Sequence, residues 1–303
     1  YLLRTSVNNS QFTNIDTAIK VQTSSSGNTN QTVSIYDAAD TILKSATTKF
    51  KSVADNFSGT INAMFIGDSF TDAGIYLAEL KRMLGEHIDL YGTRSITKPD
   101  SQDTNQTVLH EGRSSWSTSN YVNSASKNGI VNPFYNSSTN TFDFSYYMQN
   151  NTNFTDVTDV FILLGPNDVG VTTTTFVNNL KTMTNSIKSY NSNIRVHVMC
   201  PIPNVNSGYA WGIRNYSNKL TFKNSIFDFC KGIITEYDNK EGYSVIATNL
   251  NIDCWYDFPR TQVNVNQRNP EQIEVGNDNV HPNKYGYYRI SDMIYADILE
   301  YCQ

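Results

Sequence analysis

No stretch of the sequence approaches the roughly 20 consecutive apolar residues that a membrane-spanning helix needs. Runs of Lys and Arg are also missing, and 23 basic against 28 acidic residues give a net charge of −5. These absences argue against a transmembrane protein and against a protein that binds nucleic acid or anionic membranes. The N-terminus, Tyr1 to Ser6, lacks the charged and apolar regions of an intact signal peptide. We therefore expect the chain to begin inside a longer or processed protein.

Cysteine is scarce, and its spacing excludes the common structural zinc sites. The four cysteines, Cys200, Cys230, Cys254 and Cys302, include no Cys-x-x-Cys pair. We expect buried free thiols, with one or two disulfides as the alternative in a secreted protein. No group of His, Asp and Glu has metal-ligand spacing, and glycine-rich phosphate loops are absent. The sequence therefore predicts neither a metal nor a cofactor.

The composition and length suggest one large domain with N-terminal attachments. Residues 1–33 are polar and aperiodic, which indicates a linker or an attachment strand. Apolar residues at helical spacing then predict a connecting helix over 34–57. Such a connection would suit a larger surface or virion assembly. Charged residues are only 17% and Asn, Ser and Thr abound, so we expect an extracellular, cell-surface or virion-associated protein, although coding bias would give the same composition.

Strand and helix patterns alternate over residues 58–303, the expected main domain. This alternation predicts an α/β fold, a three-layer α/β/α sandwich with an approximately five-stranded parallel sheet and helices on both faces. The predicted strands are 61–66, 87–91, 159–164, 194–200 and 244–247. The predicted helices are 72–85, 172–190, a segment within 216–240, and 284–301. The segments 92–120 and 251–277 are expected to be loops, and 121–155 an insertion.

Two polar motifs follow predicted strands and should meet at one edge of the sheet. The apolar run Ile61–Phe70 ends in Gly67-Asp68-Ser69, and the strand at 159–164 ends in Gly165-Pro166-Asn167-Asp168. In parallel sheets, ligands lie beyond the carboxyl ends of the strands. A serine hydroxyl at that edge becomes a nucleophile only with a base to take its proton and donors to hold an oxyanion.

The four histidines can be weighed as candidates for this base. His87 and His197 fall at or inside predicted strands and are interpreted as structural. His110, in a polar loop, is either structural or a contact to the substrate region. His281 differs because Asp278 precedes it by three residues, so that the carboxylate can reach one imidazole nitrogen while the other faces outward. The alternative for Asp278 is a simple helix cap.

The order of these motifs along the chain points to a known family. The motifs are Gly67-Asp68-Ser69, Gly112, Gly165-Pro166-Asn167-Asp168 and Asp278-Asn279-Val280-His281. In this order the sequence resembles the SGNH (GDSL-type) hydrolase superfamily over residues 58–303. The segments 112–116, 132–135 and 142–144 further resemble a bacterial and phage-borne branch of mostly carbohydrate-type esterases.

The resemblance implies a role for each matched residue. Ser69 would be the nucleophile, His281 the general base and then the acid, and Asp278 the residue that orients His281. The backbone N–H groups of Ser69 and Gly112 and the side chain of Asn167 would form the oxyanion hole. No cofactor is implied.

Three further positions around these motifs need an interpretation. Asp68 and Asp168 are expected to cap or tie the turns after their strands rather than to act as catalytic acids. Ser115 replaces a glycine that is common in this branch, and it should stiffen the loop that carries Gly112.

A serine nucleophile with a histidine base predicts transfer of an acyl group to water, but it does not identify the substrate. We expect a serine esterase that removes O-acyl, in particular O-acetyl, groups from a carbohydrate. Arg113 and Trp116 are candidate substrate contacts, with an ordinary ion pair as the alternative for Arg113. The alternative functions are a lysophospholipase or thioesterase, and a glycan-binding module on a virion or cell surface. Further loop aromatics that could border the site are Tyr209, Trp211, Trp255 and Tyr256.

Overall fold

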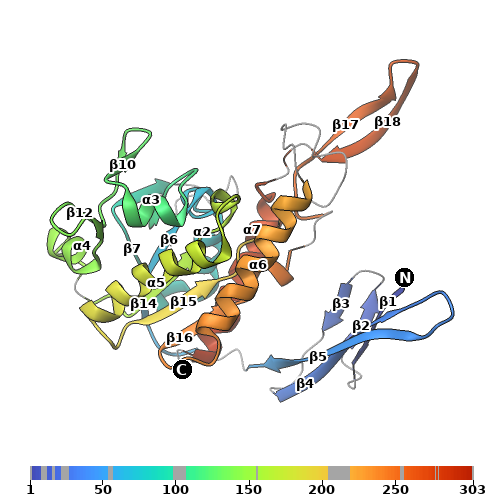
Figure 1. Ribbon diagram of the computed structural model, residues 1–303, viewed down its shortest axis with the longest axis horizontal. Coiled ribbons are helices and arrows are strands. Elements are labelled where there is room, and N and C mark those ends of the chain that lie inside the picture. The colour runs from blue at the N-terminus through green and yellow to red at the C-terminus, as the bar shows by residue number, and fades with distance from the viewer. Residues whose placement is uncertain are drawn as a thin grey trace. The chain divides into compact units, whose positions relative to one another are not determined.

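The computed structural model divides the chain into two compact units, Tyr1–Ser58 and Gly59–Cys302. Both are drawn in Figure 1. The residues that the structure describes are 2–7, 12–15, 18–21, 27–53, 57–97, 107–154, 156–203, 219–252, 256–276, 278 and 280–301.

The smaller unit consists of antiparallel strands. The long strand β4 (Gly27–Tyr36) pairs on one side with β1 (Leu2–Val7) and on the other with β5 (Ile42–Ser52). A separate two-stranded pair is formed by β2 (Phe12–Ile15) and β3 (Ala18–Val21).

The predicted connecting helix over 34–57 is therefore wrong, because its described residues form strands and a turn. For residues 1–33 we expected a linker or an attachment strand, and the described parts of this segment are strands. The helical spacing of apolar residues is interrupted by a turn. Asp37 Oδ1 accepts the N–H groups of Ala39 and Thr41, both at 2.9 Å, and Asp40 has a left-handed φ of 64°. This turn reverses the chain, so that β4 and β5 form a hairpin in place of successive helical turns.

The larger unit has the predicted α/β architecture, with a mostly parallel sheet between helices (Figure 1). All five predicted strands are present, and they pair in parallel. The strand order is β16-β15-β14-β6-β9-β8, with β7 also paired to β6. The strands of this sheet are β6 (Ile61–Gly67), β7 (Ile88–Tyr91), β8 (Arg94–Thr97), β9 (Thr107–Gly112), β14 (Asp159–Leu163), β15 (Arg195–Met199) and β16 (Tyr243–Ile246).

Helices cover both faces of this sheet. On one face α2 packs against α7, and the Ser291 hydroxyl of α7 donates to the Tyr76 carbonyl of α2 at 2.8 Å. On the other face α5 packs against α3, α4 and α6. The helices are α1 (Ser69–Asp72), α2 (Ile75–Leu84), α3 (Thr118–Asn123), α4 (Phe144–Asn150), α5 (Thr173–Tyr190), α6 (Lys219–Tyr237) and α7 (Lys284–Tyr301), with 3-10 turns η1 (Gly85–His87), η2 (Pro166–Asp168) and η4 (Thr248–Leu250). No helix among the described residues is both long and apolar enough to cross a bilayer.

Alternate side chains of the central strands enter the two apolar layers. Toward α2 and α7, Phe65 stacks on Phe161 at 4.5 Å between ring centroids, and Phe161 stacks on His197 at 4.1 Å. Toward α5 and α6, the opposite residues of the same strands join one buried cluster with the helices. This cluster includes Met64, Ile66, Val160, Ile162, Val196, Val198, Phe176, Leu180, Phe229 and Ile233.

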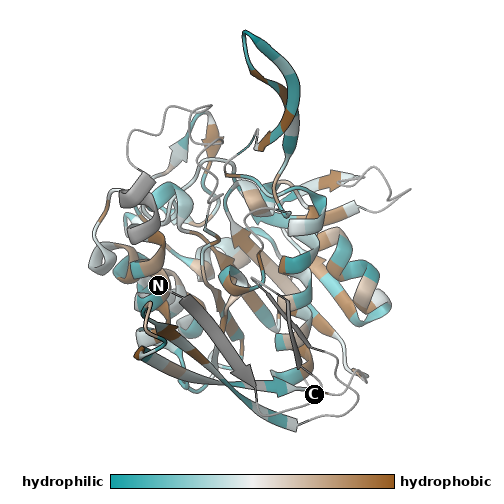
Figure 2. Ribbon diagram, turned by 90° about the vertical axis from the view of Figure 1, so that its right-hand side faces the viewer, coloured by the Kyte–Doolittle hydropathy of each residue, from teal (hydrophilic) through white to brown (hydrophobic). Residues whose placement is uncertain are grey.

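Two segments expected to be loops contain strands. Within 92–120, β8 and β9 extend the sheet, and β9 runs parallel to β6 so that Gly112 lies opposite Gly67. Within 251–277, β17 (Arg260–Asn266) and β18 (Asn269–Gly276) form a hairpin. Figure 1 shows this hairpin extending away from the helices, and Figure 2 shows that it is largely hydrophilic while the central strands are hydrophobic.

The insertion at 121–155 is small and rich in turns. Its helix α4 follows two short hairpins, which lie next to the end of α3. These hairpins are β10 (Ser126–Lys127) with β11 (Ile130–Val131), and β12 (Tyr135–Asn136) with β13 (Thr141–Phe142).

Candidate active site

Ser69, His281 and Asp278 lie in a hydrogen-bonded row at the carboxyl edge of the sheet. His281 Nε2 is 2.9 Å from Ser69 Oγ, although the two residues are 212 positions apart. On the other side of the ring, His281 Nδ1 is 3.2 Å from Asp278 Oδ2. One imidazole thus joins a hydroxyl to a carboxylate, which is the arrangement that general-base activation of a serine requires.

Local backbone geometry presents Ser69 at the end of β6. Gly67 permits the turn, because a Cβ at this position would lie 2.0 Å from Thr71 Oγ1. Asp68 Oδ1 accepts the Phe70 N–H at 3.1 Å and caps α1, as we expected for this carboxyl group. Asp68 is fully buried, and this burial raises its pKa to about 7.

The carboxylate of Asp278 both closes its own loop and holds the imidazole. Its Oδ1 accepts the backbone N–H groups of Val280 and His281 at 2.9 and 3.1 Å, while Oδ2 faces Nδ1 of His281. Partial burial opposes ionisation, but these hydrogen bonds outweigh it and hold the pKa of Asp278 below its ordinary value. The cap and the orienting role are therefore compatible, not alternatives. The Phe70 ring lies edge-on at 5.8 Å and supports the imidazole from the side.

Asn167 extends the site from the end of β14. Its Nδ2 donates to the Trp116 carbonyl at 3.1 Å and to Asp68 Oδ2 at 3.3 Å. The next residue, Asp168, accepts the Thr118 N–H at 3.0 Å and the Thr118 hydroxyl, which ties the turn to the start of α3. Burial raises the pKa of Asp168 to about 6. The structure therefore brings the Asn167 amide to the residue that directly precedes Ser69.

The backbone N–H group of Gly112, which was expected to point to the oxyanion, makes a hydrogen bond within the fold. It donates to His110 Nδ1 at 3.0 Å, and burial lowers the pKa of His110 to about 4, so that this ring is neutral and can accept. A Cβ at Gly112 would lie 2.3 Å from the Asp72 nitrogen and 2.6 Å from the Thr71 carbonyl carbon. In this structure the Gly112 amide is engaged inside the fold and the residue packs closely against α1, and its role as an oxyanion donor stays a prediction.

Arg113 and Trp116, the expected substrate contacts, are both buried. The Arg113 guanidinium forms an ion pair with Glu111 at 2.7 Å and lies 5.4 Å from the centre of the Trp116 ring system. Trp116 is 0% exposed. Neither side chain can touch a substrate in this arrangement, and the ordinary ion pair weighed for Arg113 is what the structure shows. The sequence feature that indicates this ion pair is the presence of Glu111 and Arg113 only two residues apart.

The loop after Arg113 makes a tight turn at Ser115, the position at which the resembled branch commonly has a glycine. Ser115 has a left-handed φ of 67°, and the Trp116 N–H donates to the Arg113 carbonyl at 3.1 Å. The left-handed conformation costs a residue with a Cβ on the order of 1 kcal/mol. The neighbouring contact from Lys127 Nζ to the Ser115 carbonyl helps to hold this turn.

Tyr121 was not anticipated and links the nucleophile strand to this loop. Its hydroxyl lies 2.7 Å from the Gly67 carbonyl and 2.6 Å from the Glu111 carbonyl. It therefore bridges the ends of β6 and β9, at a carbonyl two residues before Ser69. Nothing in the sequence distinguishes this tyrosine from the other 18.

The remaining predicted residues are divided between core and surface. Cys200 and Cys230 are buried free thiols, as expected, whereas Cys254 and Cys302 lie outside the described residues. Of the loop aromatics, Tyr256 is 69% exposed; Tyr209, Trp211 and Trp255 lie outside the described residues. His87 Nδ1 contacts the Gly59 carbonyl at 2.7 Å, which fits its expected structural role.

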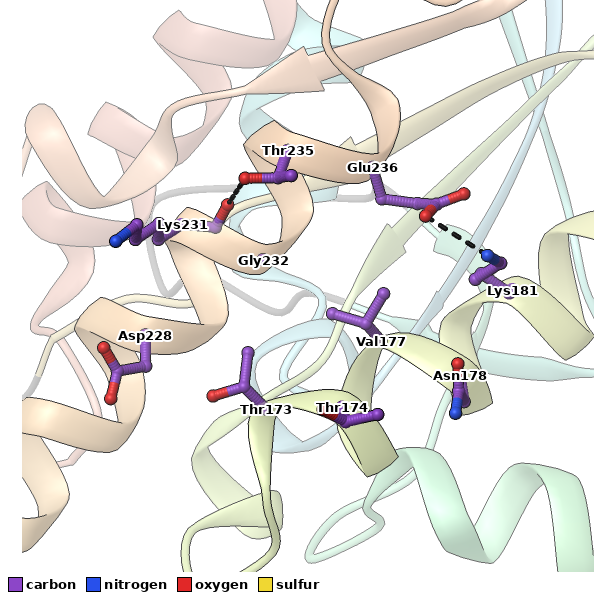
Figure 3. A pocket seen from close by; sticks show the side chains of 10 residues that line it. All are labelled: Thr173, Thr174, Val177, Asn178, Lys181, Asp228, Lys231, Gly232, Thr235 and Glu236. Carbon is purple, nitrogen blue, oxygen red and sulfur yellow. Dashed lines mark hydrogen bonds and ion pairs between the residues drawn. The ribbon is translucent and has the colours of Figure 1, made fainter.

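A surface hollow of about 370 Å³ lies between α5 and α6, away from these residues (Figure 3). Lys181 of α5 and Glu236 of α6 form an ion pair at 3.2 Å in its wall. Gly232 allows the helices to approach, because a Cβ there would lie 2.8 Å from Val177 Cγ2. None of the site residues lines this hollow, so it is a helix-packing groove and not the reaction centre.

We expect Gly112→Ala to destabilise the fold by about 1–3 kcal/mol, because the new methyl group would meet the backbone of α1. Activity should fall with stability, since α1 carries Ser69. Urea unfolding and kcat/KM for p-nitrophenyl acetate measure both effects. Gly129→Ala is the control, because its Cβ would meet nothing within 4 Å, and its positive φ alone costs about 1 kcal/mol. A loss of kcat at unchanged stability would instead support Gly112 as an oxyanion donor.

Comparisons with known proteins bear on the fold of the larger unit. No protein-family model and no curated protein matches the sequence. Among solved structures, an acetyl esterase mutant with an acetate ion is similar at a TM-score of 0.51 and 17% identity, over 80% of this chain and 97% of that chain. A carbohydrate esterase family 3 protein from Talaromyces cellulolyticus is similar at a TM-score of 0.51 and 18% identity, with the same coverage.

The larger unit has the SGNH hydrolase fold. This confirms the fold predicted from the order of the motifs. In the SGNH fold of this chain, the Gly-Asp-Ser turn follows β6, the Asn167 turn follows β14, and the Asp-x-x-His turn precedes α7. Three of the four motifs thus meet at one edge of the sheet, and the fourth, at Gly112, supports that edge from within.

Proposed function

We propose that the larger unit is a serine carboxylic ester hydrolase that uses Ser69, His281 and Asp278. The observation that carries this proposal is the row of contacts from Ser69 Oγ through both imidazole nitrogens to Asp278. In this geometry His281 Nε2 accepts the Ser69 proton, and the Asp278 carboxylate stabilises the imidazolium that forms.

The reaction then follows two acyl-transfer steps. Ser69 Oγ attacks the ester carbonyl carbon, and the alcohol leaves with the proton that His281 returns to it. Water, deprotonated by His281, next attacks the acyl-Ser69 ester and releases the acid. Asn167 Nδ2 and the Ser69 N–H are the proposed oxyanion donors. Asn167 Nδ2 donates to Asp68 Oδ2 and to the Trp116 carbonyl in this structure, so one of these two hydrogen bonds must be exchanged when Asn167 donates to the oxyanion.

We further propose that the substrate is an O-acyl, preferably O-acetyl, ester on a carbohydrate. Two similar solved structures support this choice, one of an acetyl esterase with an acetate ion and one of a carbohydrate esterase.

The acyl preference can be tested with p-nitrophenyl acetate, butyrate and octanoate. We expect kcat/KM to be highest for acetate and at least tenfold lower for octanoate, because each buried methylene is worth about 0.8 kcal/mol only where an apolar pocket receives it. Ser69→Ala supplies the background of spontaneous hydrolysis. A preference for octanoate would favour a lysophospholipase or thioesterase. Glycan binding without Ser69-dependent turnover would favour a binding module.

A further inference from the structure

Two tyrosines near His281 expose most of their side chains. Tyr256 is 69% exposed and Tyr285 is 60% exposed. Tyr285 lies four residues after His281, which limits the separation of their Cα atoms to about 14 Å. The aromatic group that the sequence favoured for stacking, Trp116, is buried. Among the residues that the structure describes, Tyr256 and Tyr285 therefore offer exposed aromatic surface in this region.

Asn283 joins the two tyrosines through their backbones. Its Oδ1 accepts the Tyr285 N–H at 2.9 Å and the Gly286 N–H at 3.1 Å, which caps the start of α7. Its Nδ2 donates to the Tyr256 carbonyl at 2.7 Å. One side chain, two residues after His281, thus places both tyrosines beside the catalytic loop.

The loop that carries Tyr256 is held firmly against α7. The Asn283 N–H donates to the Asp257 carbonyl at 2.8 Å, and the buried Asp257 carboxylate forms an ion pair with Arg289 at 2.8 Å. Gly286 permits this approach, because a Cβ there would lie 2.5 Å from the Asp257 carbonyl oxygen. A surface that is ordered before binding loses less entropy when a ligand arrives.

The ring of Tyr285 is also held in place. The Lys284 ammonium lies 5.1 Å from its centroid, and the Tyr288 ring packs edge-on at 6.2 Å. A Lys beside an aromatic ring keeps the surroundings polar, which suits a hydroxyl-rich ligand better than an acyl chain. The ring face supplies the apolar patch that a sugar ring's C–H groups can cover.

We propose that Tyr256 and Tyr285 form a carbohydrate-binding platform on which sugar rings of the substrate stack next to the scissile ester. This inference rests on the proposed function, since it names the part of an esterase that would recognise the glycan. The platform selects for ester groups carried by an oligosaccharide or polysaccharide over the same ester on a small alcohol.

The test compares two kinds of substrate for each variant. We measure kcat/KM for acetate release from partially acetylated xylan and partially acetylated glucomannan, and divide it by kcat/KM for p-nitrophenyl acetate. Tyr256→Ala and Tyr285→Ala should each lower this ratio about threefold to tenfold on the preferred polysaccharide. Tyr256→Phe and Tyr285→Phe should keep it, because the ring face remains. Tyr301→Ala is the control, since Tyr301 is 51% exposed at the opposite end of α7.

Binding gives a readout that does not depend on turnover. In the Ser69→Ala background, retardation in gels containing the same acetylated polysaccharides should weaken with either alanine variant. An unchanged ratio and unchanged retardation in both alanine variants would overturn the platform while leaving the esterase intact. Equal losses with Phe and Ala would also overturn it, because the hydroxyl group would then be the contact. Absence of Ser69-dependent hydrolysis of p-nitrophenyl acetate would refute the esterase itself.

Discussion

Replacing His281 by Ala is expected to lower kcat/KM for p-nitrophenyl acetate by about ten-thousandfold or more, and Ser69→Ala should have a similar effect. Without the imidazole, nothing takes the proton as Ser69 Oγ attacks. Without the hydroxyl, no acyl-enzyme forms. The measurement is steady-state hydrolysis after correction for spontaneous hydrolysis, with the fold of each variant checked by circular dichroism.

The double variant gives the sharper test, because residues that act as one unit are strongly non-additive. Ser69→Ala/His281→Ala should be no worse than either single variant. His87→Ala is the control histidine, since its ring contacts the Gly59 carbonyl and not the site. Multiplied losses in the double variant, or an equal loss in His87→Ala, would mean that Ser69 and His281 do not share one proton transfer.

Replacing His197 by Leu is expected to lower the free energy of unfolding by about 3–5 kcal/mol, because it removes the imidazole that bridges two carboxylates, Asp159 and Asp297, in the buried part of the fold. His197 Nε2 is 2.9 Å from Asp159 Oδ1, and Nδ1 is 2.6 Å from Asp297 Oδ2. His197 and Asp159 are 1% and 0% exposed. The cluster therefore fastens β14 and β15 to α7, on the face of the sheet that α7 covers.

The pH dependence of this loss has a defined sign. Desolvation acts against the charged imidazole, but the two carboxylates outweigh it and raise the pKa of His197 above its ordinary value of about 6.5. Burial likewise opposes ionisation of Asp159, yet hydrogen bonds from His197 and Arg195 lower its pKa. The stabilisation from His197 is thus complete below about pH 6.5 and is lost as pH rises through the folded-state pKa. The contribution from Asp159 is lost as pH falls below about 3.9.

Urea unfolding of wild type and His197→Leu from pH 4 to 9 tests this window. The difference between them should be largest at about pH 4.5–6.5 and should shrink at higher pH. His87→Leu should cost only about 1 kcal/mol, the usual value of one hydrogen bond. A pH-independent difference, or one no larger than that of His87→Leu, would show that the cluster does not hold the charged imidazole.

The contact between Asp278 and His281 and the parallel sheet could be predicted because each rests on short-range rules. Buried strands carry continuous apolar residues such as those from Ile61 to Ile66, and parallel topology then brings their carboxyl ends to one edge. Asp278 and His281 share one turn, so their contact is local. These features do not depend on the details of side-chain packing elsewhere.

The predictions from sequence failed in two situations. In one, the same residue pattern is compatible with a helix and with a strand. In the other, the role of a side chain depends on whether it is buried. Ile35 and Ala38 fit a helical period, but the Asp37 turn between β4 and β5 governs the chain there. Arg113 and Trp116 look like loop residues available to a ligand. Arg113 pairs with the nearby Glu111, which the sequence does suggest, but its packing beside the Tyr121 ring comes from α3 and is not revealed by a local pattern.

The contact between α2 and α7 sets an order of events during synthesis. Ser69 and Tyr76 belong to the first part of the sheet domain, whereas His281 and Ser291 are made more than two hundred residues later. A growing chain can complete β6 and α2 early, but it has no base for Ser69 until α7 has left the ribosome and docked. Contacts of such long sequence separation form late in folding. On the proposed mechanism, hydrolysis therefore requires α7 to be docked, and a chain in which α7 is still undocked is expected to be inactive.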